Sequence, residues 1–377
     1  MKKTSIGDEP IYDARTLGAP RMAVLGLQHM FAMFGATVLV PTLTGLSVSA
    51  TLLFAGIGTL LFHLLSGGKV PVFLGSSFAF LGGYAAIAPM LQDPATGNFN
   101  VPNTELLPYA CFGVMIAGLL CVVLAGLFKA FGAKKVMRFF PPIVTGPIII
   151  AIGLTLSSSA IANCSANWWI ALVAIVVVIA CNIWGRGMVK IVPILLGVLA
   201  SYIIAAVTGN VDFTLVKEAA WIGVPFKMSD TVFSLIGNAD TSLLLTSVIT
   251  IAPIAIATII EHIGDISAVS STCERNYIAD PGLHRTLLGD GLATSLASAF
   301  GAPANTTYGE NTGVLALSRV YDPRVIRLAA VFAIILSFCP KFAALIRVMP
   351  TATIGGISFV LYGMISAVGV RNVVENK

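Results

Sequence analysis

The chain has 377 residues, of which 57% are hydrophobic and only 10% are charged. Soluble domains carry about 25% charged residues, so a water-soluble fold of this length would lack the charge that its surface needs. This composition excludes a soluble protein and indicates one that folds in lipid. The net charge of +5 does not indicate nucleic-acid binding, because the basic residues lie in short loops between apolar runs, where they set topology.

Apolar runs long enough to cross a bilayer recur along the whole chain. A spanning helix needs about 17–25 mostly apolar residues. On this criterion the sequence predicts an all-α polytopic membrane protein with about twelve spans. These spans are predicted at residues 21–43, 50–66, 71–92, 107–129, 139–158, 167–184, 189–208, 241–262, 285–300, 304–318, 325–339 and 351–370.

The basic residues predict the orientation of the chain. With a cytoplasmic N-terminus and twelve spans, nearly all of the 22 basic residues fall on the inner side. The exceptions are Lys217, Lys227, Lys341 and Arg347. This asymmetry follows the positive-inside rule, so we expect the polar segment 1–20 to be a cytoplasmic tail. Residues 209–240 then form the one long external connection.

Two of the predicted spans contain breaks near their starts. One opens at Pro71 with PVFLGSSF and the other at Pro303 with PANTTYGENTG, and both are rich in glycine and hydroxyl side chains. Proline and glycine oppose a continuous helix. Transporters place discontinuous helices at corresponding positions of two inverted repeats, with the substrate at their junction. The residues expected to face each other there are Ser76, Ser77 and Phe78 in the first segment and Tyr308, Gly309 and Glu310 in the second.

Three acidic residues are candidates for chemistry within the membrane. A carboxylate at the bilayer centre costs about 2.5–3.5 kcal/mol and usually marks a substrate or proton path. Glu261 and Asp265 lie four residues apart, so a helix places both on one face, where repulsion favours protonation of one of them. The alternative is that the span ends at Glu261 and both acids are solvated. For Glu310 the alternative is a glycine-rich packing crossover, and for Phe78 it is ordinary packing.

Other polar residues in the spans give weaker signals. Gln28, His29 and His63 are interpreted chiefly as structural hydrogen-bond partners, with a proton relay as the alternative. The six cysteines are scattered without metal-ligand spacing. The sequence contains no nucleophile–base pair, metal cluster or nucleotide-binding loop, so we predict neither an enzyme nor a cofactor or metal site.

Five strings together carry a resemblance to a known family. They are LQHMFAMFGATVLVP (27–41), LGSSFAF (74–80), EHIG (261–264), DPGLHR (280–285) and NTTYGENTG (305–313), the last running on to Ser318 and Arg319. In these strings the chain resembles the nucleobase–ascorbate transporter family, and within it the bacterial uracil permeases. The resemblance extends from about residue 20 to 375.

The resemblance implies an inverted-repeat transporter with fourteen spans, divided into a core domain and a gate domain. The third and tenth spans of this family contain short antiparallel strands, which matches the two breaks. The chain ends at Lys377, after the twelfth predicted span, so the gate is expected to be truncated. The implied division is a tail at 1–20, core at 21–138 and 241–340, and gate at 139–240 and 341–377.

The resemblance also implies the site and its substrate. Glu261 and Glu310 would bind the ring N–H groups of a nucleobase; the other lining residues would be Phe78, Tyr308, Gly309, Ala36 and Tyr362. Uracil permeases have Glu at position 310, whereas purine carriers of the family have Gln, and a carboxylate can only accept hydrogen bonds. Asp265 stands where some uracil permeases have His, so the proton-coupling group is Glu261, Asp265 or Glu310.

We therefore expect uracil:proton symport across the cytoplasmic (inner) membrane, with uracil, a proton and the lipid bilayer as partners and a homodimer as a further possibility. The alternative within the family is a xanthine or other nucleobase symporter. A channel or anion transporter of related fold would instead require a basic residue or bare helix N-termini at the midplane.

Overall fold

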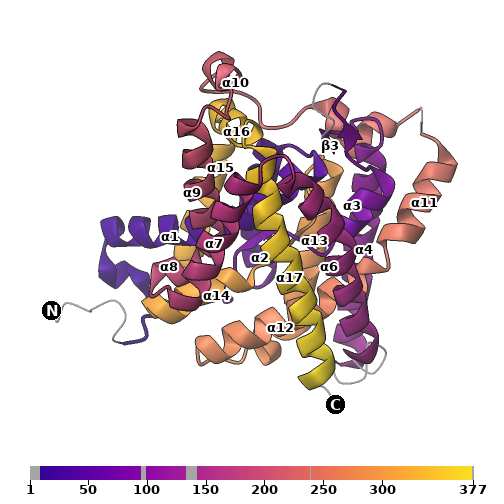
Figure 1. The fold of residues 1–377 in the computed structure, drawn as a ribbon. Helices are drawn as coiled ribbons and strands as arrows, with labels where there is room; N and C mark the ends of the chain where they lie inside the picture. The colour runs from indigo at the N-terminus through magenta and orange to yellow at the C-terminus, as the bar shows by residue number, and fades with distance from the viewer. Residues whose placement is uncertain (1–8, 95–98, 133–141, 238, 376–377) are drawn as a thin grey trace.

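The computed structural model describes residues 9–94, 99–132, 142–237 and 239–375. The predicted division between residues 138 and 139 lies outside these residues, as does part of the predicted tail. The described chain is mostly helical (Figure 1). Its helices of ten residues or more are α1 (Ala19–Thr44), α2 (Val48–Leu65), α4 (Leu107–Phe131), α6 (Pro142–Cys164), α7 (Trp168–Trp184), α9 (Pro193–Val207), α11 (Thr241–Ile251), α12 (Ile254–Thr272), α13 (Leu283–Ala299), α14 (Gly309–Ser318), α15 (Pro323–Ser337) and α17 (Thr351–Glu375).

Shorter elements connect these helices. They are η1 (Ala14–Leu17), α3 (Leu81–Ile87), α8 (Met188–Ile191), α10 (Thr214–Glu218), η3 (Met228–Asp230), η4 (Val232–Leu235), η5 (Ile278–Gly282) and α16 (Pro340–Arg347), with strands β1 (Leu74–Ser76), β2 (Leu91–Gln92), β3 (Phe99–Val101) and β4 (Asn305–Thr307). Within the described residues, α1, α2, α4 and the α11–α12 unit are long and apolar enough to cross a membrane, and the α15–α16 pair, bent by 83°, would be a fifth span. Helix α16 was not foreseen from the sequence.

The exposed surface of α7 is largely apolar. Its two ends carry exposed tryptophans, Trp169 and Trp184, and an apolar face that includes Val176 lies open between them. Tryptophan is enriched where a span enters and leaves the bilayer. Because a large exposed apolar surface is unfavourable in water, this helix is suited to a membrane environment. The chain is accordingly a multi-pass membrane protein.

The helices form two packed groups. In the first, α2 packs on α13 and α15, while α13 also packs on α4; in the second, α17 packs on α6, α7 and α9. In Figure 1, α17 runs along the front of the second group. Close approach within the first group depends on small residues. A Cβ at Gly118 of α4 would lie only 2.7 Å from the carbonyl oxygen of Gly291 of α13, so the two helices could not approach as closely with a larger residue there. Small residues are common at helix contacts within membranes for this reason.

The two predicted breaks are confirmed and meet each other. Strands β1 and β4 pair antiparallel, with Leu74 opposite Thr307 and Ser76 opposite Asn305. Helix α14 begins directly after β4, and α3 follows β1. This pairing satisfies backbone groups that a broken helix would otherwise leave without partners inside the membrane. The two half-helices therefore start from one shared two-stranded element.

The structure corrects the helix end at Glu261. The sequence predicted a span over 241–262, but α12 continues to Thr272. The bend lies earlier, at Pro253, between α11 and α12. A proline cannot donate the hydrogen bond that continues a helix, which explains the break. The helix therefore continues past Glu261, although Glu261 itself is exposed.

Candidate functional site

The junction of the two broken segments is organised by Tyr308, the last residue before α14. Its hydroxyl donates to the carbonyl oxygen of Ser76 at 2.8 Å and lies 3.2 Å from the hydroxyl of Thr37 on α1. The hydroxyl of Ser76 donates to the carbonyl oxygen of Ala36 at 2.9 Å. Thus three predicted residues, Ala36, Ser76 and Tyr308, form one buried hydrogen-bonded unit that joins α1, β1 and β4. Thr37 was not foreseen.

Gly75 allows the Tyr308 ring to lie against β1. A Cβ at this position would lie 2.5 Å from Cε2 of Tyr308, which is too close for any real contact. The backbone N–H of Tyr308 also donates to the carbonyl oxygen of Phe73 at 3.1 Å. The conformation of α14 at its first turn is therefore fixed by close packing as well as by hydrogen bonds.

The acidic side of the junction is contributed by α12. Asp265 lies one helical turn after Glu261, so both carboxylates lie on one face of the helix, as predicted. Asp265 is half-buried and Glu261 is exposed. A Cβ built on Gly309 would lie 3.3 Å from Oδ1 of Asp265, so this carboxylate lies at the first residue of α14. Glu310 is the second residue of α14; its side chain lies outside what the structure describes.

Asp265 is connected to a buried acid, Asp290, through Thr307. The Thr307 hydroxyl donates to Oδ2 of Asp265 at 2.8 Å, and its backbone N–H donates to Oδ1 of Asp290 at 2.9 Å. Asp290 lies on α13 and is 1% exposed. His262 places Nδ1 3.4 Å from Asp290 and Nε2 3.0 Å from the hydroxyl of Thr286. The site thus contains a buried polar network that crosses α12, α13 and β4.

Asp290 is a functional candidate that the sequence analysis missed. It lies within the predicted span 285–300, and the cost of a carboxylate at membrane depth should have marked it.

His29 and His63 both make hydrogen bonds inside the protein, which fits the structural role expected of them. The amide of Asn311 donates to the carbonyl oxygen and to Nδ1 of His29, both at 3.1 Å, and Nε2 of His63 lies 2.9 Å from the carbonyl oxygen of Val72.

Phe78 and Tyr362 lie on the apolar side of the junction. Phe78 is half-buried and packs against two apolar clusters, one containing Ala36 and Tyr308 and the other containing Tyr362. Tyr362 is 2% exposed and also lines a cavity of about 610 Å³. That cavity extends toward the α1–α2 turn at Gly45, away from the carboxylates of α12. An aromatic ring beside a cavity is suited to a flat ligand.

The junction has the features of a site for a small neutral molecule with hydrogen-bond donors. It combines carboxylate acceptors, the N-terminus of α14 and aromatic side chains. In the described part of the chain, no group of three or more His, Cys, Asp or Glu side chains could hold a metal ion. The chemistry that this arrangement supports is reversible binding.

Comparisons with known proteins place the chain among permeases. The xanthine/uracil permease model of the permease family matches residues 20–377. A uracil permease of Bacillus caldolyticus is 40% identical over 97% of this chain and 82% of its own length. The uracil permease of Bacillus subtilis (strain 168) is 39% identical over 93% of this chain and 79% of its own length. The putative pyrimidine permease RutG of Escherichia coli (strain K12) is 38% identical over 100% of this chain and 83% of its own length.

Solved structures show the fold. The transmembrane domain of a cyanobacterial bicarbonate transporter, BicA, matches with a TM-score of 0.66 at 17% identity, covering 97% of this chain and 98% of that one. The murine anion transporter Slc26a9 in its inward-facing state matches with a TM-score of 0.64 at 13% identity, covering 95% of this chain and 61% of that one. At these identities the likeness concerns architecture alone, and function has to be argued from the site.

Proposed function

Because this chain belongs to the xanthine/uracil permease family, whose members are transporters and not enzymes, we propose that it carries uracil together with a proton across the cytoplasmic membrane. The proposal rests first on one observation. The carboxylate of Asp265 lies at Gly309, the first residue of α14, where the two broken segments meet. Carboxylates there can accept hydrogen bonds from the ring N–H groups of a nucleobase.

In this proposal Glu261 and Glu310 hold the base. Glu310 stands on the first turn of α14, and Glu261 stands one turn before Asp265 on α12. An ionised carboxylate accepts from N–H donors, and such charge-assisted hydrogen bonds are about twice as strong as neutral ones. A glutamate in the first turn of a helix is favoured by the helix dipole, which would stabilise negative charge at Glu310.

The remaining predicted residues line the site. Tyr308 and Gly309 form the wall at the start of α14, with Ala36 behind them. Phe78 stacks on the base, since its half-buried ring lies between the clusters of Tyr308 and Tyr362. Offset or edge-on ring pairs contribute about 0.5–1.5 kcal/mol beyond their area burial.

Proton coupling is assigned to the acids of α12 and α14. Carboxylates brought together around a bound base would not all remain ionised, because like charges disfavour one another. Binding a proton on Glu261, Asp265 or Glu310 would therefore accompany binding of the neutral base. The Thr307 hydroxyl donates to Oδ2 of Asp265 and so ties this acid to the start of α14.

The two helix groups suggest how transport proceeds. The group with α2, α4, α13 and α15 would be the core that carries the site, and the group with α6, α7, α9 and α17 would be the gate. We propose that they move against each other, with the N-terminus in the cytoplasm and the chain paired as a homodimer. Movement of one bundle against another around a fixed site is the usual basis of alternating access.

A xanthine symporter is the alternative within the family, and Glu310 weighs against it because purine carriers of the family have Gln there. An anion carrier is the alternative suggested by the fold. Half-helix N-termini do attract anions, but Asp265 already places a carboxylate at the N-terminus of α14. That acid favours a ligand that donates hydrogen bonds.

Uptake into proteoliposomes tests the proposal. Labelled uracil should accumulate when the outside is made acidic, and an ionophore that collapses the gradient should abolish the accumulation. Uptake that is indifferent to the gradient would refute proton coupling. Uptake of bicarbonate, with no uracil uptake, would refute the substrate. Recovery of the label as unchanged uracil would separate transport from chemical conversion.

A further inference from the structure

The segment before α1 is folded onto the core rather than extended away from it. We call residues 11–17 the N-terminal strap. The backbone N–H of Ile11 donates to the carbonyl oxygen of Arg319, and the N–H of Tyr321 donates to the carbonyl oxygen of Ile11, both at 2.8 Å. Arg319 is the C-cap residue of α14. The strap therefore forms a one-residue parallel bridge with the turn between α14 and α15.

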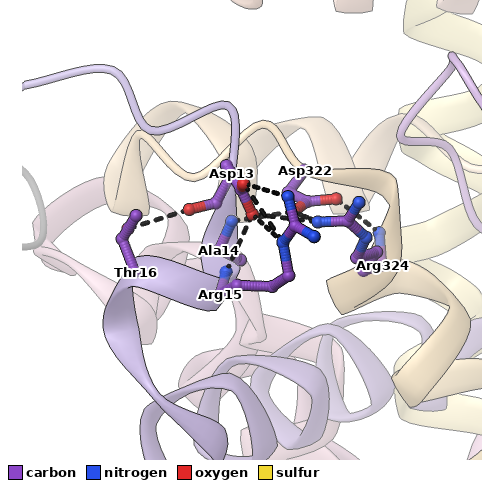
Figure 2. A network of polar contacts seen from close by, with 6 residues as sticks. All are labelled: Asp13, Ala14, Arg15, Thr16, Asp322 and Arg324. Atoms are coloured by element: carbon purple, nitrogen blue, oxygen red, sulfur yellow. Dashed lines mark hydrogen bonds and ion pairs between the residues drawn. The ribbon is translucent and has the colours of Figure 1, made fainter.

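Charged groups fix the middle of the strap to the same turn (Figure 2). The N–H of Ala14 donates to Oδ2 of Asp322 at 2.7 Å, and Arg324 donates to Oδ1 of Asp13 at 2.9 Å. Asp322 is only 3% exposed, and its Oδ1 accepts the N–H of Arg324 to cap α15. Because a buried carboxylate needs several donors, the strap completes the coordination of Asp322. The Arg15 side chain, hydrogen-bonded to Asp13, holds the pKa of Asp13 well below its usual range.

A second attachment reaches α12. The hydroxyl of Tyr12 donates to the carbonyl oxygen of Cys273, the C-cap residue of α12, at 3.0 Å. The guanidinium of Arg275 lies 4.2 Å above the Tyr12 ring, and the Tyr12 and Tyr321 rings lie 5.6 Å apart. One short segment thus holds the ends of two helices that are separated widely in the sequence.

Apolar packing supports these bonds. Ile11, Ala14 and Leu17 are buried together with Val320 of the α14–α15 turn and Val325 of α15. Burying such side chains is favourable because it removes apolar surface from water. The strap is therefore part of the folded core, although it precedes the first membrane helix.

The position of these attachments gives the strap a consequence for the site. Helix α14 has ten residues, with Gly309 at one end and Arg319 just past the other. Helix α12 carries Glu261 and Asp265 and ends at Thr272, with Cys273 as its C-cap. Both helices are stiff and rise about 1.5 Å per residue, so a shift at the strap end is transmitted over about 15 Å to the site end. Asp265 lies within contact distance of Gly309 only while the two helices keep their relative position.

We propose that the N-terminal strap is a positioning element for substrate binding: by fastening the far ends of α12 and α14 to each other, it holds Asp265 and Glu261 in place against the start of α14. The inference rests on the proposed function only in its choice of ligand. The residues that act are Tyr12, toward α12, and Asp13 and Ala14, toward α14 and α15. They touch no substrate and act through the two helices.

Two substitutions in the full chain separate the attachments. Tyr12→Phe removes the hydroxyl that bonds to Cys273 and keeps the ring. Ala14→Pro removes the N–H that bonds to Asp322, at the first position of η1, where proline suits the backbone. Thr16→Ala is the matched control, since the Thr16 hydroxyl bonds only within the strap, to the carbonyl oxygen of Asp13.

Hydrogen–deuterium exchange and equilibrium binding of uracil to the purified protein give the two readouts. We expect Ala14→Pro to increase hydrogen exchange in α12 and α14 while exchange in α4 and α17 stays unchanged. The same variant should weaken uracil binding about fivefold. Tyr12→Phe should have a smaller effect on both readouts, and Thr16→Ala should have none. Unchanged exchange in α14, or an increase spread evenly over the chain, would overturn the proposal. Increased exchange in α12 and α14 with unaltered affinity for uracil would overturn it as well. If the unmodified chain bound no uracil, the proposed function would fail and the exchange pattern alone would decide the role of the strap.

Discussion

Thr307 donates its hydroxyl to the carboxylate of Asp265 at 2.8 Å while its backbone N–H donates to Asp290 at 2.9 Å. One residue of a three-residue strand therefore joins acids from α12 and α13. The strand lies immediately before α14, so this connection fixes where Asp265 lies relative to Gly309. A carboxylate that keeps its donors in place is ready to accept a further hydrogen bond from a ligand.

Thr307→Val tests this connection, because valine keeps the shape of threonine and removes only the hydroxyl. Asp265 would lose a charge-assisted hydrogen bond, for which we expect a loss of about 1.5–3 kcal/mol in the free energy of unfolding. Uracil binding should weaken as well, measured by titration of the purified protein. Thr306→Val, in the same strand, is the control and should retain affinity. Equal losses in both variants would show that the effect comes from the strand and not from Asp265.

Asp290 is expected to act mainly as an acceptor for the Thr307 N–H. Asp290→Ala leaves a buried N–H without a partner, which costs about 1–3 kcal/mol, and should lower the Tm of the purified protein. Asp290→Asn retains an oxygen at the same place and should recover most of that loss. If Asn were as destabilising as Ala, the charge of Asp290 and its proximity to His262 would be the important feature instead.

Gly75 and Gly82 offer a matched pair for the packing at the junction. Gly75→Ala would force its Cβ into the Tyr308 ring, whereas a Cβ at Gly82 of α3 meets no atom within 4 Å. We expect Gly75→Ala to weaken uracil binding at least tenfold, since overpacking costs about 1–3 kcal/mol. Gly82→Ala should be neutral or slightly stabilising, because alanine is the better helix former. Normal binding by Gly75→Ala would show that Tyr308 is free to move.

The strap should be insensitive to pH in the physiological range. The hydrogen bond from Arg15, with Arg324 nearby, depresses the pKa of Asp13 below the unfolded value of about 3.9. A depressed pKa gives a stabilisation that is complete above the unfolded value and disappears as the pH falls through the folded one. The difference in Tm between the unmodified protein and Asp13→Asn should thus be constant from about pH 5 to 8 and shrink only in stronger acid. A difference that changed near pH 6–7 would assign the strap a role in pH sensing.

Much of this architecture could be predicted from the sequence. Apolar length located the long helices, and the prolines with glycine-rich strings located the two breaks, because backbone without helix geometry is rare inside a membrane. The spacing of Glu261 and Asp265 predicted their shared helix face. These signals are local, and each depends on residues that lie close together in the chain.

What the sequence did not predict depends on contacts between distant segments. The hydrogen bonds from Ala14 to Asp322 and from Tyr12 to Cys273 join residues that are hundreds of positions apart. In the sequence, the strap has the composition of an ordinary polar tail. Asp290 was overlooked although it is a lone acid in an apolar span. Its partner is a backbone N–H on another element, and no pattern in one sequence reveals such a pairing.

A uracil site at this junction can be tested by equilibrium binding of labelled uracil to the purified protein, with unlabelled xanthine as competitor. We expect saturable binding that unlabelled uracil displaces, competition by xanthine that is at least tenfold weaker, and a loss of affinity of more than tenfold, about 1.4 kcal/mol, in Glu310→Gln. Glu218→Gln, on α10 and away from the junction, should bind normally. Equal competition by xanthine, or unchanged uracil binding in Glu310→Gln, would contradict it.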